Sequence, residues 1–141
     1  MIDAGAGPVD SREFLTLSDI PGTSPLTGFL RYEHTFQLLG GSTLVPRLTL
    51  RYSDGYYLNQ LTQAMVDMGQ LPYNYQDSYT TCDFGITWTS DDGKYSASAW
   101  VHNLTDEEYK LSAFISGTGT NTNVAYLGAP RNAGVNFSIR F

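Results

Sequence analysis

The end of the chain carries a strict alternation of apolar and polar residues. In residues 132–141 the odd positions from 133 onward are apolar, whereas the even positions are polar or glycine. Successive side chains on a β-strand point to opposite faces, so this pattern predicts a strand with one face toward an apolar medium and the other toward water. The strand ends on the aromatic residue Phe141.

The same alternation recurs in four earlier segments of the chain. It predicts strands over residues 27–38, 44–53, 79–89 and 94–116. In the second of these, Pro46 predicts a local defect or bulge, because proline has no N–H to donate to a ladder. Gly-Gly at residues 40–41 and Asp-Gly at residues 92–93 predict tight turns, since glycine adopts the positive φ that short hairpins need.

The predicted strands are joined by connections that alternate short and long. Residues 39–42 and 90–93 are short turns, whereas residues 59–76 and 117–129 are expected to be long loops, with a single helical turn around residues 61–68 as the alternative in the first. The alternation holds if residues 94–116 form one strand with a bulge or projecting segment at residues 103–108. We adopt that interpretation over a turn at residues 103–106, because transmembrane barrels have short turns on one side and long loops on the other.

These elements predict an all-β fold, an antiparallel meander of about five long strands. Residues 1–25 lack periodicity and contain several prolines and glycines, which predicts a loop or irregular lead-in. Residues 26–141 form the remaining domain. Residues 1–7 show neither the basic region nor the apolar core of a signal peptide.

Composition agrees with a sheet that has one apolar and one wet face. The 141 residues are 41% hydrophobic and 13% aromatic but only 16% charged, and soluble domains usually have roughly 25% charged residues. A net charge of -6 argues against a nucleic-acid partner, which requires a basic surface. Cys82 is the single cysteine, so an internal disulfide is excluded.

Short motifs in the second half of the chain resemble those of a known family. Asn-Leu-Thr-Asp-Glu-Glu-Tyr occupies residues 103–109, and Gly-Ala-Pro-Arg occupies residues 128–131. Together with the aromatic residues 51–57 and the closing strand 134–141, they resemble the carboxy-terminal end of the barrel of TonB-dependent outer-membrane receptors. The residues that match the family's motifs are Asn103, Leu104, Asp106, Tyr109, Gly128, Pro130 and Arg131.

The resemblance implies a roughly 22-stranded transmembrane β-barrel, a plug domain and a box that contacts TonB. Such receptors lie in the outer membrane of Gram-negative bacteria and import ferric siderophores, cobalamin, haem or glycans with TonB-coupled energy. About five strands cannot close a barrel, which needs at least about eight. We therefore predict a fragment of such a receptor, whose partners are outer-membrane lipid, the barrel-assembly machinery, and TonB and the plug through the rest of the parent.

Three groups of residues are candidates for a role in this setting. The closing strand resembles the terminal signal that the barrel-assembly machinery recognises, through Val135, Phe137, Ile139 and Phe141. The long loops are expected to be extracellular, and their candidate substrate-facing residues are Tyr73, Tyr75, Asn121 and Asn123. Aromatic girdles at the two membrane interfaces are expected from Tyr32, Tyr52, Trp88, Trp100 and Tyr109.

No catalytic, metal-binding or cofactor-binding residues are predicted, and an enzyme is not expected. His34 and His102 lack a second ligand at metal spacing, and the acidic residues 106–108 are interpreted as a solvated turn rather than a calcium site. Two other classes of function stay open. One is a small outer-membrane barrel that assembles as an oligomer. The other is a soluble β-sheet binding module, whose turn signals should recur every 8–12 residues or so.

Overall fold

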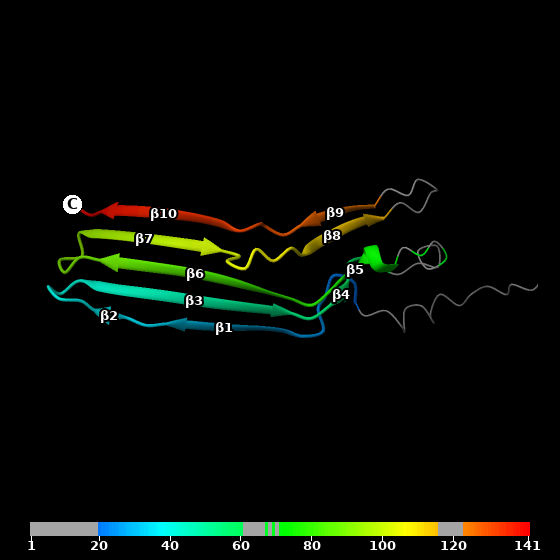
Figure 1. Ribbon diagram of the computed structural model, residues 1–141, viewed down its shortest axis with the longest axis horizontal. Coiled ribbons are helices and arrows are strands. Elements are labelled where there is room, and N and C mark those ends of the chain that lie inside the picture. Colours follow the sequence, from blue (N-terminus) through cyan, green and yellow to red (C-terminus); the bar gives the residue numbers. More distant parts are fainter. Residues whose placement is uncertain (1–19, 61–66, 68, 70, 116–122) are drawn as a thin grey trace, which may run out of the picture.

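The main structure of the chain is a single antiparallel sheet. A computed structural model describes residues 20–60, 67, 69, 71–115 and 123–141. Its principal sheet has the strand order β1-β3-β6-β7-β10, with β2 also paired to β3 (Figure 1). The strands are β1 (Thr27–Glu33), β2 (Phe36–Gln37), β3 (Thr43–Ser53), β6 (Tyr79–Thr89), β7 (Tyr95–His102) and β10 (Asn132–Ile139). The predicted all-β antiparallel meander is confirmed, because every pairing in this sheet is antiparallel.

The register of the sheet gathers the apolar residues on one face. Directly opposed residues of an antiparallel pair share a face. One row across the sheet therefore consists of Tyr32, Leu48, Phe84, Val101 and Ala133. The large side chains of this face are most exposed on the edge strands, with 81% of Phe137 and 66% of Val135 exposed in β10.

The opposite face of the sheet is mainly polar. The row next to the apolar one consists of Glu33, Arg47, Gly85, Trp100 and Gly134. Rows on this face also carry the threonines and serines of β3, β6 and β7, with the exception of Thr80. We call it the wet face.

The two ends of the sheet differ in the length of their connections. The turns after β2 and β6 lie at one end, together with the carboxy terminus (Figure 1). Each turn is closed by a backbone hydrogen bond, from Gly41 to Leu38 at 3.3 Å and from Gly93 to Ser90 at 3.0 Å. The N–H of Arg140 donates to the Lys94 carbonyl at 2.9 Å, which holds the terminus beside the second turn. The long connections all lie at the other end, as the sequence predicted.

Pro46 interrupts the ladder between β3 and its outer neighbour. Its carbonyl accepts from the His34 N–H at 3.3 Å, so the side of Pro46 that lacks a donor faces β1 and β2. β1 ends opposite Arg47 and β2 begins opposite Leu44, with no residue inserted between them. The predicted defect is therefore a break in hydrogen bonding without the register shift of a bulge.

Residues 94–116 do not form one continuous strand. β7 ends at His102, and the chain resumes as β8 (Lys110–Ile115), which pairs with β9 (Asn123–Leu127) in a separate two-stranded sheet. β8 continues beyond β7 toward the long-connection end and β9 leads back into β10, so the chain does not reverse at residues 103–106 (Figure 1). The predicted direction of the segment is correct, but its continuity is wrong, and part of the predicted loop 117–129 is strand.

The first long connection also contains regular structure. β4 (Tyr56–Tyr57) pairs with β5 (Tyr75–Gln76), and the 3-10 turn η1 (Leu71–Asn74) precedes β5. The prediction of a loop over residues 59–76 is wrong for these last residues. The alternative helical turn at residues 61–68 falls almost entirely outside the described residues, as do positions 1–19 of the lead-in. No helix in the described ranges is both long and apolar enough to cross a membrane.

Candidate functional site

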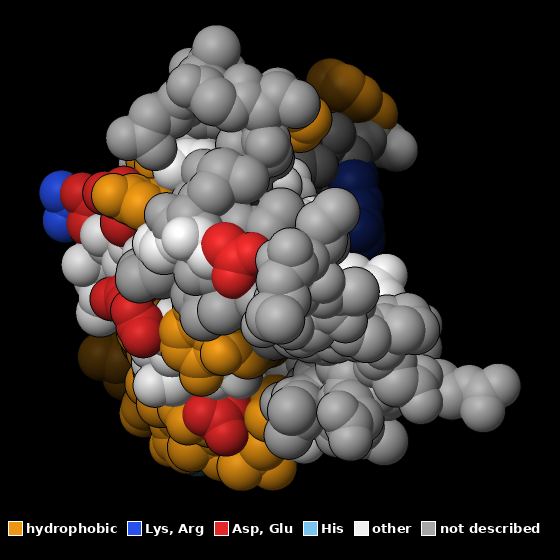
Figure 2. Space-filling view, turned by 90° about the vertical axis from the view of Figure 1, so that its right-hand side faces the viewer, with side chains coloured by type: hydrophobic (Ala, Val, Ile, Leu, Met, Phe, Trp, Pro, Cys, Tyr) orange, Lys and Arg blue, Asp and Glu red, His pale blue; other side chains and the backbone are white. Residues whose placement is uncertain are grey.

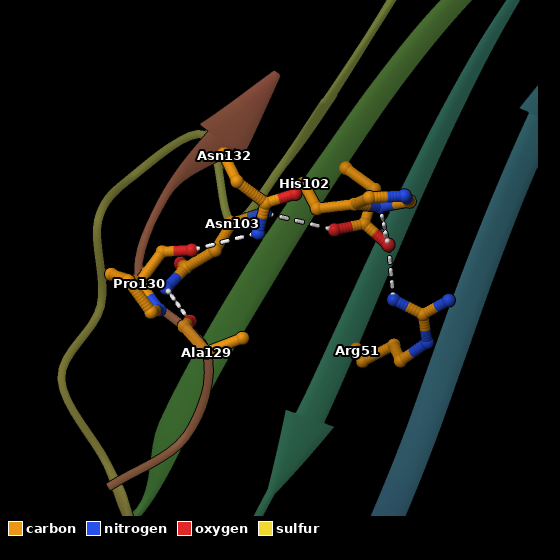
Figure 3. A network of polar contacts seen from close by, with 7 residues as sticks. Arg51, His102, Asn103, Ala129, Pro130 and Asn132 are labelled. Carbon is orange, nitrogen blue, oxygen red and sulfur yellow. Dashed lines mark hydrogen bonds and ion pairs between the residues drawn. The ribbon is translucent and has the colours of Figure 1, made fainter. Parts of the chain in front are cut away.

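The break between β7 and β8 (residues 103–109) lies next to the break between β9 and β10 (residues 128–131). We call these two segments together the strand joint. Asn103 lies at its centre with a φ of 50° and 5% of its surface exposed. Its amide nitrogen donates to the Glu107 carbonyl at 2.8 Å, and its amide oxygen accepts from the Glu107 N–H at 2.9 Å. The same nitrogen donates to the Ala129 carbonyl at 3.2 Å (Figure 3). One buried amide therefore fixes both interruptions.

Asp106 makes the second link across the strand joint. It also has a positive φ, 57°, and its N–H donates to the Asn103 carbonyl at 2.9 Å, which closes a tight turn. Its carboxylate accepts from the Arg131 N–H at 3.0 Å and forms an ion pair with the Arg131 guanidinium at 3.6 Å. Asn and Asp adopt the left-handed region more readily than other non-glycine residues, which explains their presence at these two positions.

Tyr109 and Gly128 close the outer side of the strand joint. The Gly128 N–H donates to the Tyr109 carbonyl at 2.7 Å, and a Cβ atom on Gly128 would overlap the Tyr109 ring. That ring stacks on Tyr79 with centroids 4.4 Å apart. The remaining motif residues take part through their backbones, since the Leu104 N–H donates to the Cys82 carbonyl at 2.6 Å and the Pro130 carbonyl accepts from the Asn132 side chain at 3.0 Å.

A wet-face network anchors the strand joint to the sheet through a residue that the sequence did not single out. Asp83 of β6 accepts from the Asn103 N–H at 3.0 Å through one oxygen. Its other oxygen pairs with the Arg51 guanidinium and lies 3.5 Å from Nδ1 of His102 (Figure 3). The sequence feature that could have indicated the role of Asp83 is that it is the single acidic residue in residues 79–89.

The wet face is hollowed beside this network. The hollow has a volume of about 900 Å³. Its lining combines the charged or titratable side chains of Arg51, Asp83 and His102 with the rings of Tyr79 and Tyr109. It offers hydrogen-bond donors, acceptors and ring faces for non-covalent contacts. No group of three or more potential metal ligands occurs in the described parts of the chain.

Two of the expected girdle residues do not lie on the apolar face. Trp100 lies on the wet face, where its ring covers Gly134 and lies 4.7 Å from the His102 ring. Tyr109 belongs to the strand joint through its stacking on Tyr79. Tyr32, Tyr52 and Trp88 do share the apolar face, since they pair with Leu48, Gly28 and Leu44 in register.

The carboxy-terminal candidates share one exposed stripe. Val135, Phe137 and Ile139 pair with Ala99, Ala97 and Tyr95 on the apolar face. Their exposed fractions are 66%, 81% and 57%. Phe141 follows at the end of the chain and is also fully exposed. The stripe is accessible along the free edge of β10.

Three of the loop candidates, Tyr73, Tyr75 and Asn123, lie at the long-connection end, where described acidic and hydrophobic side chains reach the surface (Figure 2). Tyr73 is exposed in η1, whereas Tyr75 packs edge-on against Tyr57 with centroids 5.0 Å apart. The amide oxygen of Asn123, at the start of β9, is buried without a hydrogen-bond partner among the described residues. Asn121 lies outside the described residues.

Comparison with known proteins shows a structural likeness. No family model and no curated protein sequence matches the chain. Among solved structures, the ferric yersiniabactin uptake receptor FyuA from Yersinia pestis matches with a TM-score of 0.64 and 23% sequence identity over 80% of this chain. The match spans 16% of that receptor chain. The chain therefore has the fold of a segment of a receptor barrel, several times shorter than the whole receptor.

Proposed function

We propose that this chain forms the carboxy-terminal strands of a TonB-dependent outer-membrane receptor. In this proposal the whole receptor imports a scarce nutrient, namely a ferric siderophore, cobalamin, haem or a glycan, with energy coupled through TonB. The observation that carries the proposal is the single apolar face that continues through all the strands of the principal sheet. The structural likeness to an uptake receptor supports it.

The dimensions of the sheet support a position within a lipid bilayer. β3 and β6 each have 11 residues, and about 9–11 residues are enough for a tilted strand to cross the hydrocarbon core. Large apolar side chains of this face are exposed along the edge strands β1 and β10, such as Leu30 at 65%, and those of the central strands are partly exposed. In water this exposure would promote aggregation, but against lipid it needs no cover.

The same exposed face argues against a soluble β-sandwich. A sandwich buries the inner faces of two sheets against each other. Here the apolar face of the principal sheet has no second layer over it in the described part of the chain, and the two small sheets lie beyond its end rather than across it (Figure 1).

The unpaired edges of the sheet are an argument for additional strands on both sides. β1 and β10 each have one neighbour in the described sheet, so each leaves a row of backbone groups without a ladder. A closed barrel removes such edges by adding strands. We therefore propose that the partners are outer-membrane lipid, the barrel-assembly machinery and further strands, plug and TonB-binding segment of a longer receptor.

Membrane fractionation of the source cells tests the proposal. An antibody against this chain should detect an outer-membrane protein several times larger than 15.6 kDa, and deletion of its gene should abolish TonB-dependent uptake of one of the four nutrient classes. Replacing Phe137 and Phe141 by serine should lower the assembled amount, because both belong to the proposed assembly signal. Ser138→Ala, on the wet face of the same strand, is the matched control. A 15.6 kDa product confined to the soluble fraction would contradict the proposal.

A further inference from the structure

The described parts of the two long connections are joined by side-chain amides. Asn74 ends η1 and is fully buried, at 0% exposure. Its amide oxygen accepts from the Asn59 N–H at 3.0 Å, and its amide nitrogen donates to the Asn59 carbonyl at 3.0 Å. The side chain therefore pairs with the Asn59 backbone as a neighbouring strand would, and it extends the short β4–β5 ladder by one step.

Asn59 also forms a hydrogen bond to the second long connection. Its side-chain nitrogen donates to the Asn74 amide oxygen at 3.1 Å and to the Ala113 carbonyl of β8 at 2.7 Å. A bond that joins residues 54 positions apart in the sequence cannot arise from local turn chemistry.

Gln76 makes a second link to β8. Its amide oxygen accepts from the Lys110 N–H at 2.6 Å, and the Lys110 ammonium donates to the Tyr75 carbonyl at 2.8 Å. Gln76 is itself buried, with 6% of its surface exposed. Buried polar groups are costly unless they are paired, so these amides favour one arrangement of the two connections over others.

We propose that Asn59, Asn74 and Gln76 form an amide clasp that makes the described parts of both long connections, β4–β5 with η1 and β8–β9, move as one platform. Within it, Asn74 and Asn59 are positioning residues that set where exposed side chains such as Tyr73 stand relative to β9. That this platform presents a ligand-binding surface rests on the proposed function, whereas the mechanical coupling does not. In the receptor, a ligand that shifted one of these parts would thereby shift the other.

Distances between spin labels test the coupling in the full-length protein in outer-membrane vesicles. Nitroxides are attached at Tyr73→Cys and Tyr126→Cys, both on exposed side chains, with Cys82 replaced by alanine. We expect one narrow distance distribution with the clasp intact. Asn59→Ala removes the donor to Ala113 but keeps the backbone that Asn74 uses, and it should broaden the distribution about twofold through local opening. Asn74→Ala should broaden it further.

The matched control is Asn136→Ala, which removes an exposed amide from the wet face of β10 and should leave the distribution unchanged. Unchanged widths in both Asn59→Ala and Asn74→Ala would overturn the proposal. If Asn74→Ala fails to assemble, the milder Asn59→Ala decides the test. The measurement uses no substrate, so failure of the import proposal would leave its outcome standing.

Discussion

The principal sheet is held together differently from the outer assembly, by which we mean β4, β5 and η1 together with β8 and β9. In the sheet, continuous backbone ladders set the register, and the apolar side chains of neighbouring strands fall on one face. In the outer assembly, β4, β5, β8 and β9 are short, and the links between the two connections come from individual side chains such as Asn59 and Gln76. The strand joint, centred on Asn103, connects the two regions.

This difference determines how each region responds to change. A ladder distributes its hydrogen bonds over many residues, so the sheet depends on the character of each face more than on any one side chain. The outer assembly and the strand joint depend on a few buried amides, whose loss leaves several partners unpaired. The difference between the two regions is therefore tested by substitutions that change either the polarity of a sheet face or one buried contact.

The largest effect is expected from a charge on the apolar face. Leu48 lies at the middle of β3 and belongs to the row from Tyr32 to Ala133 on the apolar face. Leu48→Arg should lower the free energy of unfolding in lipid vesicles by about 2–4 kcal/mol, the cost of arginine at the bilayer midplane. The control is Thr87→Arg on the exposed wet face of β6, which should have little effect. Equal losses in urea titrations of the two variants would show that the apolar face does not contact lipid.

The next effect is expected at the centre of the strand joint. Asn103→Ala removes three hydrogen bonds and leaves the Glu107 N–H and two carbonyls without their partner. We expect a loss of about 2–3 kcal/mol in the free energy of unfolding. Asn103→Gly accommodates the positive φ easily, so the loss that remains in this variant comes from the amide bonds and from the greater freedom of glycine in the unfolded chain. If Asn103→Gly were as stable as the original chain, the amide bonds would contribute nothing.

A smaller effect is expected where Tyr109 packs over Gly128. A Cβ atom at residue 128 would overlap a ring that is already stacked on Tyr79. Gly128→Ala should therefore cost about 1–2 kcal/mol, as overpacking does. Tyr109→Ala removes the obstacle, so the double variant should be more stable than the sum of the single losses predicts. Additive losses in this double-mutant cycle would mean that the ring does not restrict residue 128.

The smallest effect is expected in the short turn after β6, outside both regions. The Ser90 hydroxyl at 2.7 Å and the Lys94 N–H at 3.0 Å both donate to Asp92 and hold its pKa below the ordinary value of 3.8. A lowered carboxyl pKa stabilises the turn above the unfolded pKa, and this contribution is lost as the pH falls through the folded pKa. Ser90→Ala should move the Asp92 titration, followed by carbon-13 NMR, back toward pH 3.8. Ser98→Ala within β7 should leave it unchanged.

The sheet could be predicted from the sequence because its physical basis is periodic. Alternation over residues 79–89 gave the bounds of β6, and the glycine turns gave the hairpin ends. The outer assembly could not be predicted, because an amide such as Asn74 reveals its partner only when distant segments meet. The pairings of β8 and β9 likewise depend on a strand joint that alternation does not describe.

The candidate site was only partly predictable for related reasons. The family resemblance identified the motif residues, and in the structure they lie together around Asn103. Asp83 was missed because its role depends on the register of β6 with β3 and β7. Trp100 was expected in an aromatic girdle but lies on the wet face, in agreement with its even position in β7, where the apolar positions are odd.

The unbroken rows of the sheet also constrain how such a chain can change in length. Losing one residue inside β6 would send every following side chain of that strand to the opposite face, so that Phe84 and Asp83 would exchange environments. Losing two adjacent residues would keep each side chain on its own face. Insertions and deletions inside the sheet should therefore survive in steps of two, whereas this parity does not apply to segments outside the strands. Changes in length can then alter the surface beyond the sheet while each side chain of the sheet stays on its own face.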